Sequence, residues 1–356
     1  MILLALAKLL SYLGLSLLAG GAVLHWRRLA ALPLWWFGLG AGLVLLGGVA
    51  EVGSTLADLG FTAPADVADF LTGTRQGQAA LIRVIGAVLL LAAEVQGWRW
   101  LALGGGLVLL WGTATAGHAG ERGLGWTLLD ALHAGGAAIW VGGVLGLALL
   151  TLLRHPASLD AGRGFTPIAL ACLAVLFVSG GVVALSHVPI ASLWPALWGS
   201  TWGLALLIKV GLLGLALLAA VLVRRALYAR RVAPLWLEGA LLLGVLGASG
   251  ALATQPPPTS LEVQRQVVPV SVELAGQSIS GSLVLSGPGD LELRLDSAPP
   301  GVSAQLLMTD HPMPAQPLEL TTADGGVQAQ TRLWMSGGWS LELSEGGERV
   351  QVPFRY

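Results

Sequence analysis

The chain has 356 residues, of which 55% are hydrophobic and only 11% are charged. A soluble domain carries roughly 25% charged residues, so this composition excludes a wholly soluble globular protein. The charge is unevenly divided: residues 1–254 hold nine acidic and 14 basic side chains, whereas residues 255–356 hold 11 acidic and five basic ones. We therefore predict a membrane domain at 1–254, a Pro-rich linker at 255–260 and an acidic soluble domain at 261–356.

Eight apolar segments of the first domain come close to the length of about 20 residues that a membrane-spanning helix needs. The first segment carries Lys8 before its apolar core and Arg27 and Arg28 after it, which reverses the charge order of a signal peptide. We therefore expect this segment to be retained as a helix. Together the segments predict an all-α polytopic membrane bundle of 8 transmembrane helices, at residues 2–25, 34–57, 77–96, 98–118, 126–153, 165–187, 202–224 and 234–254.

The arginines between these segments predict the orientation of the bundle. Nine arginines follow the first, third, fifth and seventh segments, whereas only Arg75 and Arg122 follow the second, fourth and sixth. Basic loops stay on the cytoplasmic side, so both termini are expected outside the cytoplasm. Residues 63–73 are expected to form a short amphipathic segment on the outer surface.

Beyond the linker the hydrophobic period changes from that of a helix to that of a strand. Val268, Val270, Val272 and Leu274 alternate with other residues, which places them on one face of a strand. Short strands separated by Gly, Pro and Asp, about seven in number, predict a C-terminal all-β sandwich domain. The remaining expected strands lie at 279–285, 291–295, 302–308, 327–334, 338–343 and 349–354.

Residues 129–146 are the most unusual of the apolar segments, because they contain Asp130, His133 and Trp140. A helix with 3.6 residues per turn places these three side chains along one side. Small residues at four-residue spacing, among them Gly142, allow a second helix to approach closely. Ionisable side chains inside a membrane helix are costly, so they indicate a functional site.

Histidines gather toward the outer half of the predicted bundle. His118 and His187 end their helices at the outer face, and His133 lies about 10 Å deep at 1.5 Å per residue. Neutral imidazole suits copper, zinc or haem iron. Asp130, one turn away, could orient the His133 ring through a hydrogen bond. Alternatively, a histidine at a membrane boundary simply sits among the lipid headgroups.

Other buried charges show the same bias toward the outer half. Glu51, Arg83 and Lys209 each fall in the outer half of a predicted helix, which predicts an outward-facing polar pocket. A protonated lysine or arginine cannot coordinate a metal, so we assign Arg83 and Lys209 structural or electrostatic roles. The alternative is that these charges pair with one another and lock the bundle together.

A second ligand-rich segment lies in the β domain. Met308, His311 and Met313 occur within six residues. Thioether sulfur together with imidazole is a soft ligand set that selects Cu(I). Met335 follows later in the chain and is either a further ligand or a core residue before a turn.

The membrane domain, with its Asp130, His133 and Trp140, resembles the copper resistance protein D family of bacterial membrane proteins. The C-terminal part resembles a YtkA-like or copper-chaperone-type β-domain at 308–314 and 334–341, with Asp310 and Pro312 standing where Met, Gly or His is expected. The first resemblance runs over residues 1–258 and is carried by Gly117-His118-Ala119, Asp130…His133…Trp140-Val141-Gly142-Gly143, Ser179-Gly180, Thr201-Trp202-Gly203, Lys209-Val210, Arg224-Arg225, Glu238 and Ala253-Thr254-Gln255-Pro256-Pro257.

The resemblance implies a protein that handles copper, with His118 and His133 as metal residues and Asp130 orienting the ring. We expect copper import, in which the β domain captures Cu(I) and passes it to an outer-facing site that His187 joins. No Gly-Lys-Ser/Thr phosphate-binding loop is present, and we expect no enzymatic activity.

Two other functions remain open. Histidines on adjacent helices could hold b-type haem in a membrane electron-transfer protein. The chain could also be an assembly factor that delivers copper to a respiratory oxidase through its outer domain. The expected partners are the lipid bilayer and an extracytoplasmic copper chaperone or cuproprotein. Nucleic acid is not expected as a partner, and homo-oligomerisation stays open.

Overall fold

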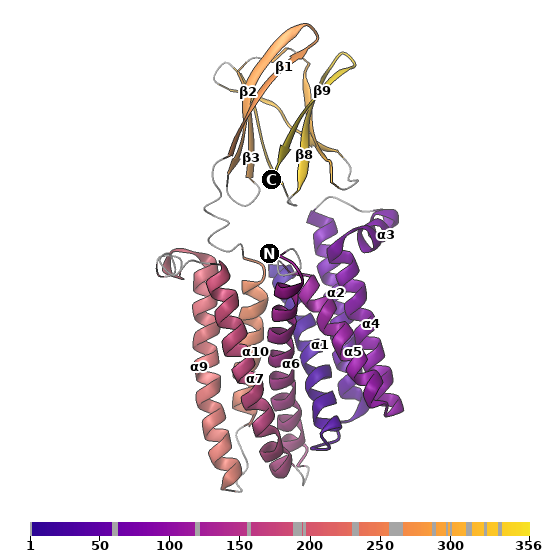
Figure 1. The fold of residues 1–356 in the computed structure, drawn as a ribbon, viewed down its shortest axis with the longest axis vertical. Helices are drawn as coiled ribbons and strands as arrows, with labels where there is room; N and C mark the ends of the chain where they lie inside the picture. The colour runs from indigo at the N-terminus through magenta and orange to yellow at the C-terminus, as the bar shows by residue number, and fades with distance from the viewer. Residues whose placement is uncertain are drawn as a thin grey trace. The chain divides into compact units, whose positions relative to one another are not determined.

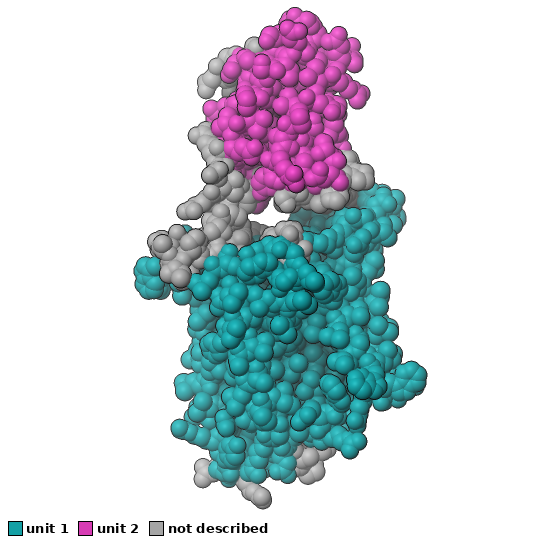
Figure 2. Space-filling view, viewed as in Figure 1, with its two compact units in different colours: residues 1–255 teal, residues 256–356 magenta. Residues whose placement is uncertain are grey.

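Two compact units, Met1–Gln255 and Pro256–Tyr356, make up the chain (Figure 2). Each unit is described by itself. The computed structural model describes residues 2–58, 63–117, 122–154, 158–187, 194, 197–229, 235–255, 266–286, 290–296, 298–299, 301–310, 315–323, 326–333 and 337–356.

The first unit is a bundle of antiparallel helices, as predicted (Figure 1). All eight predicted segments form helices. In the described ranges, seven of them are long and apolar enough to cross a membrane; α5 has only 17 residues. At 1.5 Å per residue α5 is about 26 Å long, shorter than predicted. The helices are α1 Ile2–Trp26, α2 Leu34–Asp58, α4 Arg75–Gln96, α5 Arg99–Thr115, α6 Leu124–Leu152, α7 Ser158–His187, α9 Thr201–Tyr228 and α10 Leu235–Leu252.

We call the end of the bundle where α1, α4, α6 and α9 begin the N-end (Figure 1). The helix α3 (Pro64–Gly73) lies there, where a short amphipathic segment was predicted. Pro64 suits its first turn, because that N–H needs no partner within the helix. The Asp66 carboxylate accepts a hydrogen bond from the Ala63 N–H at 2.9 Å, and Phe70 is buried.

Helices α1 and α6 form the centre of the bundle. Two apolar clusters meet at them, one shared with α2, α4 and α5 and the other with α7, α9 and α10. The predicted small-residue row allows this packing: a Cβ atom at Gly142 would overlap the Ser16 carbonyl oxygen, and one at Gly20 would overlap the Gly142 backbone. Two-thirds of the apolar core of α6 (67%) is buried, against 17% for α9. The peripheral helices therefore present their apolar faces to lipid.

Exposed tryptophans mark both ends of the bundle. Indole rings favour the boundary between lipid and water, so two such rows are typical of a membrane-spanning bundle. At the N-end they are Trp111, Trp194 and Trp198, and at the opposite end they are Trp26, Trp35, Trp98, Trp100 and Trp236.

The second unit is the predicted all-β domain. Its strands pair antiparallel in two sheets, of order β1-β2-β3-β7-β6 and β5-β4-β8-β9. One apolar core between the sheets takes Leu283 and Leu293 from the first and Leu306 and Leu341 from the second. The strands are β1 Gln266–Leu274, β2 Gln277–Ser286, β3 Asp290–Leu295, β4 Ser303–Met308, β5 Gln316–Leu318, β6 Thr321–Ala323, β7 Gly326–Arg332, β8 Gly338–Glu345 and β9 Glu348–Arg355.

Candidate functional site

His133 on α6 is held by a hydrogen bond to the neighbouring helix α7. Its Nδ1 lies 2.9 Å from the Ser179 hydroxyl oxygen, and that hydroxyl is 2.6 Å from the Val175 carbonyl oxygen. A serine hydroxyl has one proton, and the carbonyl can only accept it. With that proton donated to the Val175 carbonyl, the His133 Nδ1 donates to Ser179, and the lone pair of Nε2 has no partner in the described part of the chain.

A glycine on α7, Gly180, leaves space for the His133 ring. A Cβ atom at Gly180 on α7 would lie 3.2 Å from the ring carbon Cε1. Such a contact is tighter than normal packing, so a side chain here would displace the ring. The pair Ser179-Gly180 thus supplies both the hydrogen-bond acceptor and the space that fix the imidazole. Sequence reasoning noted this pair as part of the resemblance but did not recognise it as part of the site.

Asp130 and Lys209 complete the polar surroundings of His133. Their charges attract each other across α6 and α9, and Lys209 also acts on His133. Ser179, rather than Asp130, is the observed partner of the His133 Nδ1. The three predicted residues Asp130, His133 and Lys209 therefore share one polar region near the N-end.

The end of α7 is tied to the beginning of α6. The Arg122 guanidinium donates to the Ser186 hydroxyl at 2.9 Å and stacks 3.7 Å above the centre of the Trp126 ring. These contacts hold the last turn of α7, which ends at His187, against the first turn of α6. The side chain of His187 and the whole of His118 lie outside the residues that the structure describes.

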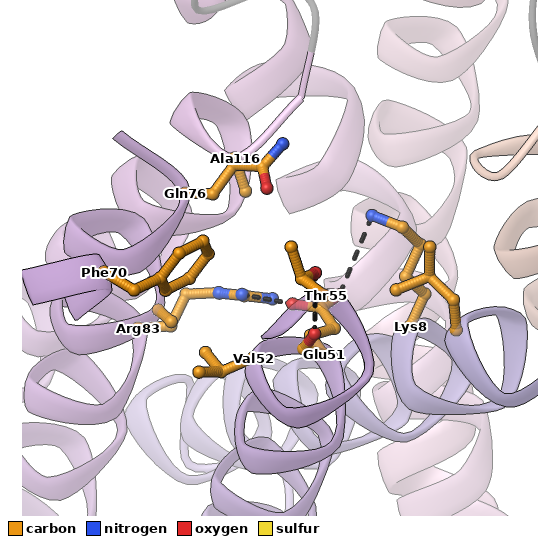
Figure 3. Close-up of a pocket in the computed structure, with 10 residues that line it drawn as sticks. Lys8, Glu51, Val52, Thr55, Phe70, Gln76, Arg83 and Ala116 are labelled. Carbon is orange, nitrogen blue, oxygen red and sulfur yellow. Dashed lines mark hydrogen bonds and ion pairs between the residues drawn. The ribbon is translucent and has the colours of Figure 1, made fainter. Parts of the chain in front are cut away.

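Glu51 and Arg83 form part of a second polar cluster, between α1, α2 and α4 (Figure 3). The Arg83 guanidinium donates to the Glu51 carboxylate, whose other oxygen lies 3.7 Å from the Lys8 ammonium. This network joins three helices and agrees with the interpretation that charges lock the bundle. Lys8 was missed as a site residue because the sequence does not show which charges on different helices face each other.

Trp140 faces a different partner. Its side chain is 2% exposed and lies beside the carboxylate of Glu238 on α10, which is 3% exposed. Seven residues separate Trp140 from His133, about 10 Å along α6. Trp140 and Glu238 therefore form a separate polar pair deeper in the bundle.

In the β domain, Met308 ends β4 and is 8% exposed within the apolar core. The next two residues are hydrogen-bonded to Gly338. The Thr309 N–H donates to the Gly338 carbonyl at 2.9 Å, and the Gly338 N–H donates to the Asp310 carboxylate at 2.7 Å. Asp310 therefore links the end of β4 to the start of β8. The predicted ligands His311, Met313 and Met335 lie outside the described residues.

Metal-ligating side chains are few where the structure can be described. In those ranges, no three His, Cys, Asp or Glu side chains converge on a site that could hold a metal ion. The single cysteine, Cys172, is buried. A copper site at His133 therefore has fewer than three donors of these residue types in the described part and needs further ligands.

A comparison with protein families finds a match in the membrane unit. The family described as Copper resistance protein D matches residues 159–252, which span nearly all of α7 and the whole of α9 and α10. Ser179, Lys209 and Glu238 lie inside this segment, whereas Asp130 and His133 lie before it. No curated protein and no solved structure matches the chain.

Proposed function

We propose that this chain, a multi-pass membrane protein whose membrane unit contains a copper resistance protein D domain, imports copper across a bacterial plasma membrane. The family relates the membrane unit to copper handling. The direction of transport, the order of the binding sites and the placement of both termini outside the cytoplasm are our proposal.

The observation that carries the proposal is the hydrogen bonding of His133. Because Nδ1 donates to Ser179, the neutral ring presents an unprotonated Nε2, the form in which imidazole binds a metal. A hydrogen bond on the other nitrogen also orients the ring and raises its basicity as a ligand. The negative charge of Asp130 acts on Lys209 and would offset part of the repulsion between Lys209 and an arriving cation.

Further ligands at this site come from the helix ends nearest to His133. Helix α6 packs against α5 and α7, and both of these end at the N-end. His187 is the last residue of α7, and His118 follows α5 by three residues. We propose that these two histidines complete the coordination of copper, because two or three nitrogen donors suit Cu(I).

The β domain is proposed to capture copper first. The hydrogen bonds of Thr309 and Asp310 to Gly338 bring together the flanks of residues 311–314 and 334–336. In this proposal Met308, His311 and Met313 bind Cu(I), and Met335 lies on the neighbouring segment. Weak, exchangeable soft ligands allow the ion to move on to the histidines of the bundle.

Copper loading of the detergent-purified full chain under reducing conditions tests the proposal. The variant His133→Gln keeps a side chain that can hydrogen-bond to Ser179 but lacks a soft nitrogen donor. The matched control is His25→Gln, because His25 pairs with Glu94 at the opposite end of the bundle. We expect less bound copper per chain in His133→Gln, because only the site in the β domain remains, and normal loading in His25→Gln.

Equal copper loading in both variants would exclude His133 as a ligand. An absorption spectrum with a Soret band and no copper would instead favour the b-type haem protein. Absence of both groups in the wild-type chain would favour the oxidase assembly factor.

A further inference from the structure

We propose that the cavity beside Lys8, Glu51 and Arg83 is a binding site for a small monovalent anion of the size of chloride (Figure 3). The cavity lies near the N-end of the bundle, where α3 and the beginning of α4 meet α1 and α2. This site is distinct from the polar region around His133 and does not depend on the proposed copper transport.

Among the described residues that line the cavity, the charges do not balance. Lys8 and Arg83 supply two positive charges, and Glu51 supplies one negative charge that both of them share. Arg83 is only 5% exposed, and its Nε has no hydrogen-bond partner in the described part of the chain. Because an unbalanced charge inside a membrane bundle is costly, one bound anion would neutralise the cluster.

The cavity has room for such an ion. Its volume is about 90 Å³, several times the roughly 10–15 Å³ that one water molecule requires. Figure 3 shows the Lys8 ammonium directed at the open space, with the Gln76 amide at its edge and Phe70 among its apolar walls. An ammonium donates hydrogen bonds, as an anion requires, and rotation of the Gln76 amide would bring its N–H groups toward the ion.

A cation fits this cavity poorly. Both carboxylate oxygens of Glu51 are already engaged, one by Lys8 and the other by Arg83. The Thr55 hydroxyl donates its proton to the Glu51 carbonyl at 2.9 Å. A metal ion would therefore meet two positive charges before it found a free carboxylate.

Binding of radioactive chloride to the full chain in detergent, together with melting in chloride against gluconate, tests the proposal. We expect saturable binding by the wild-type protein and a higher melting temperature in chloride. Lys8→Met should weaken binding by roughly tenfold or more, because it removes a charge-assisted contact in a site of low dielectric constant.

A carboxylate built into the cavity provides the sharper test. Gln76→Glu places a negative charge where the anion would lie, so this variant should melt at the same temperature in chloride and gluconate. The matched control is Gln96→Glu, the same change at the opposite end of α4, which should keep the response to chloride.

An equal response to chloride in the wild type, Lys8→Met and Gln76→Glu would indicate a general salt effect and overturn the proposal. Absence of saturable binding in the wild type would mean that the cavity holds only water. Copper loading, measured in parallel, should be unchanged in Gln76→Glu, so failure of this proposal and failure of the transport proposal are separate outcomes.

Discussion

The single proton of the Ser179 hydroxyl determines which nitrogen of His133 can meet a ligand. Because the Val175 carbonyl takes that proton, the imidazole is held as the tautomer with a free Nε2. A serine that bonds back to its own helix, ordinarily a minor feature of membrane helices, here sets the chemistry of a residue on the adjacent helix.

Replacing Ser179 should therefore weaken copper binding without unfolding the bundle. We expect Ser179→Ala to lower Cu(I) affinity by roughly 10-fold to 100-fold, as is usual when the partner of a ligating histidine is lost. Titration against a competing Cu(I) chelator measures this effect. Ser249→Ala is the control, because Ser249 makes the same bond back to its own helix in α10. Similar affinities of the two variants would contradict the role of Ser179.

Glu342 makes the β domain sensitive to acid. Hydrogen bonds from Gln351 and Gln305 lower the pKa of this carboxyl, with a smaller contribution from Arg349. A carboxyl whose pKa is lower in the folded state stabilises the fold above its unfolded pKa, and that stability is lost as the pH falls through the folded pKa.

We expect Glu342→Gln to reduce the loss of stability that sets in as the pH falls below about 5, toward the lowered folded pKa of this glutamate. Urea unfolding of a 266–356 fragment measures it, since this unit has its own core. Glu319→Gln, at an exposed position, should keep the wild-type pH dependence. Identical pH profiles for wild type and Glu342→Gln would show that the hydrogen bonds do not carry this effect.

At the level of elements, the contact between α1 and α6 determines how closely the bundle packs. A glycine in a helix normally costs up to about 1 kcal/mol relative to alanine, so Gly→Ala usually stabilises. Gly142→Ala should do the opposite, because its Cβ atom would overlap the Ser16 carbonyl. We expect a lower melting temperature and a lower yield of folded protein. Gly211→Ala is the control, because a Cβ atom there meets nothing within 4 Å.

Most elements could be predicted from the sequence, since hydropathy and hydrophobic period report directly on burial. The eight helices, the short helix at 64–73 and the main strands were expected. The short strands β5 and β6 were missed, because three-residue segments show no period. Pairings between helices, such as His133 with Ser179 and Lys8 with Glu51, could not be predicted, because spacing within one helix does not reveal its neighbour.

At the scale of the whole molecule, the two units have separate cores. The apolar cluster of the β domain contains only residues from 268 onward, and those of the bundle end before 247. We therefore expect the bundle to fold without residues 256–356. If the chain is a transporter that captures copper through the β domain, deleting residues 256–356 should reduce the uptake of copper by cells, as measured by metal analysis. Unchanged cellular copper with a loss of oxidase maturation would instead favour the assembly factor.

The two rows of tryptophan restrict how the bundle can move. A shift of the whole bundle along the membrane normal would drag indole rings at one end into the hydrocarbon and lift those at the other end out of the headgroup layer. The tryptophans thus keep the bundle at a fixed depth in the membrane. A passage for an ion would then open by rearrangement among the helices, and the peripheral α7 and α9, with 11% and 17% of their apolar cores buried, are less enclosed than α6 with 67%.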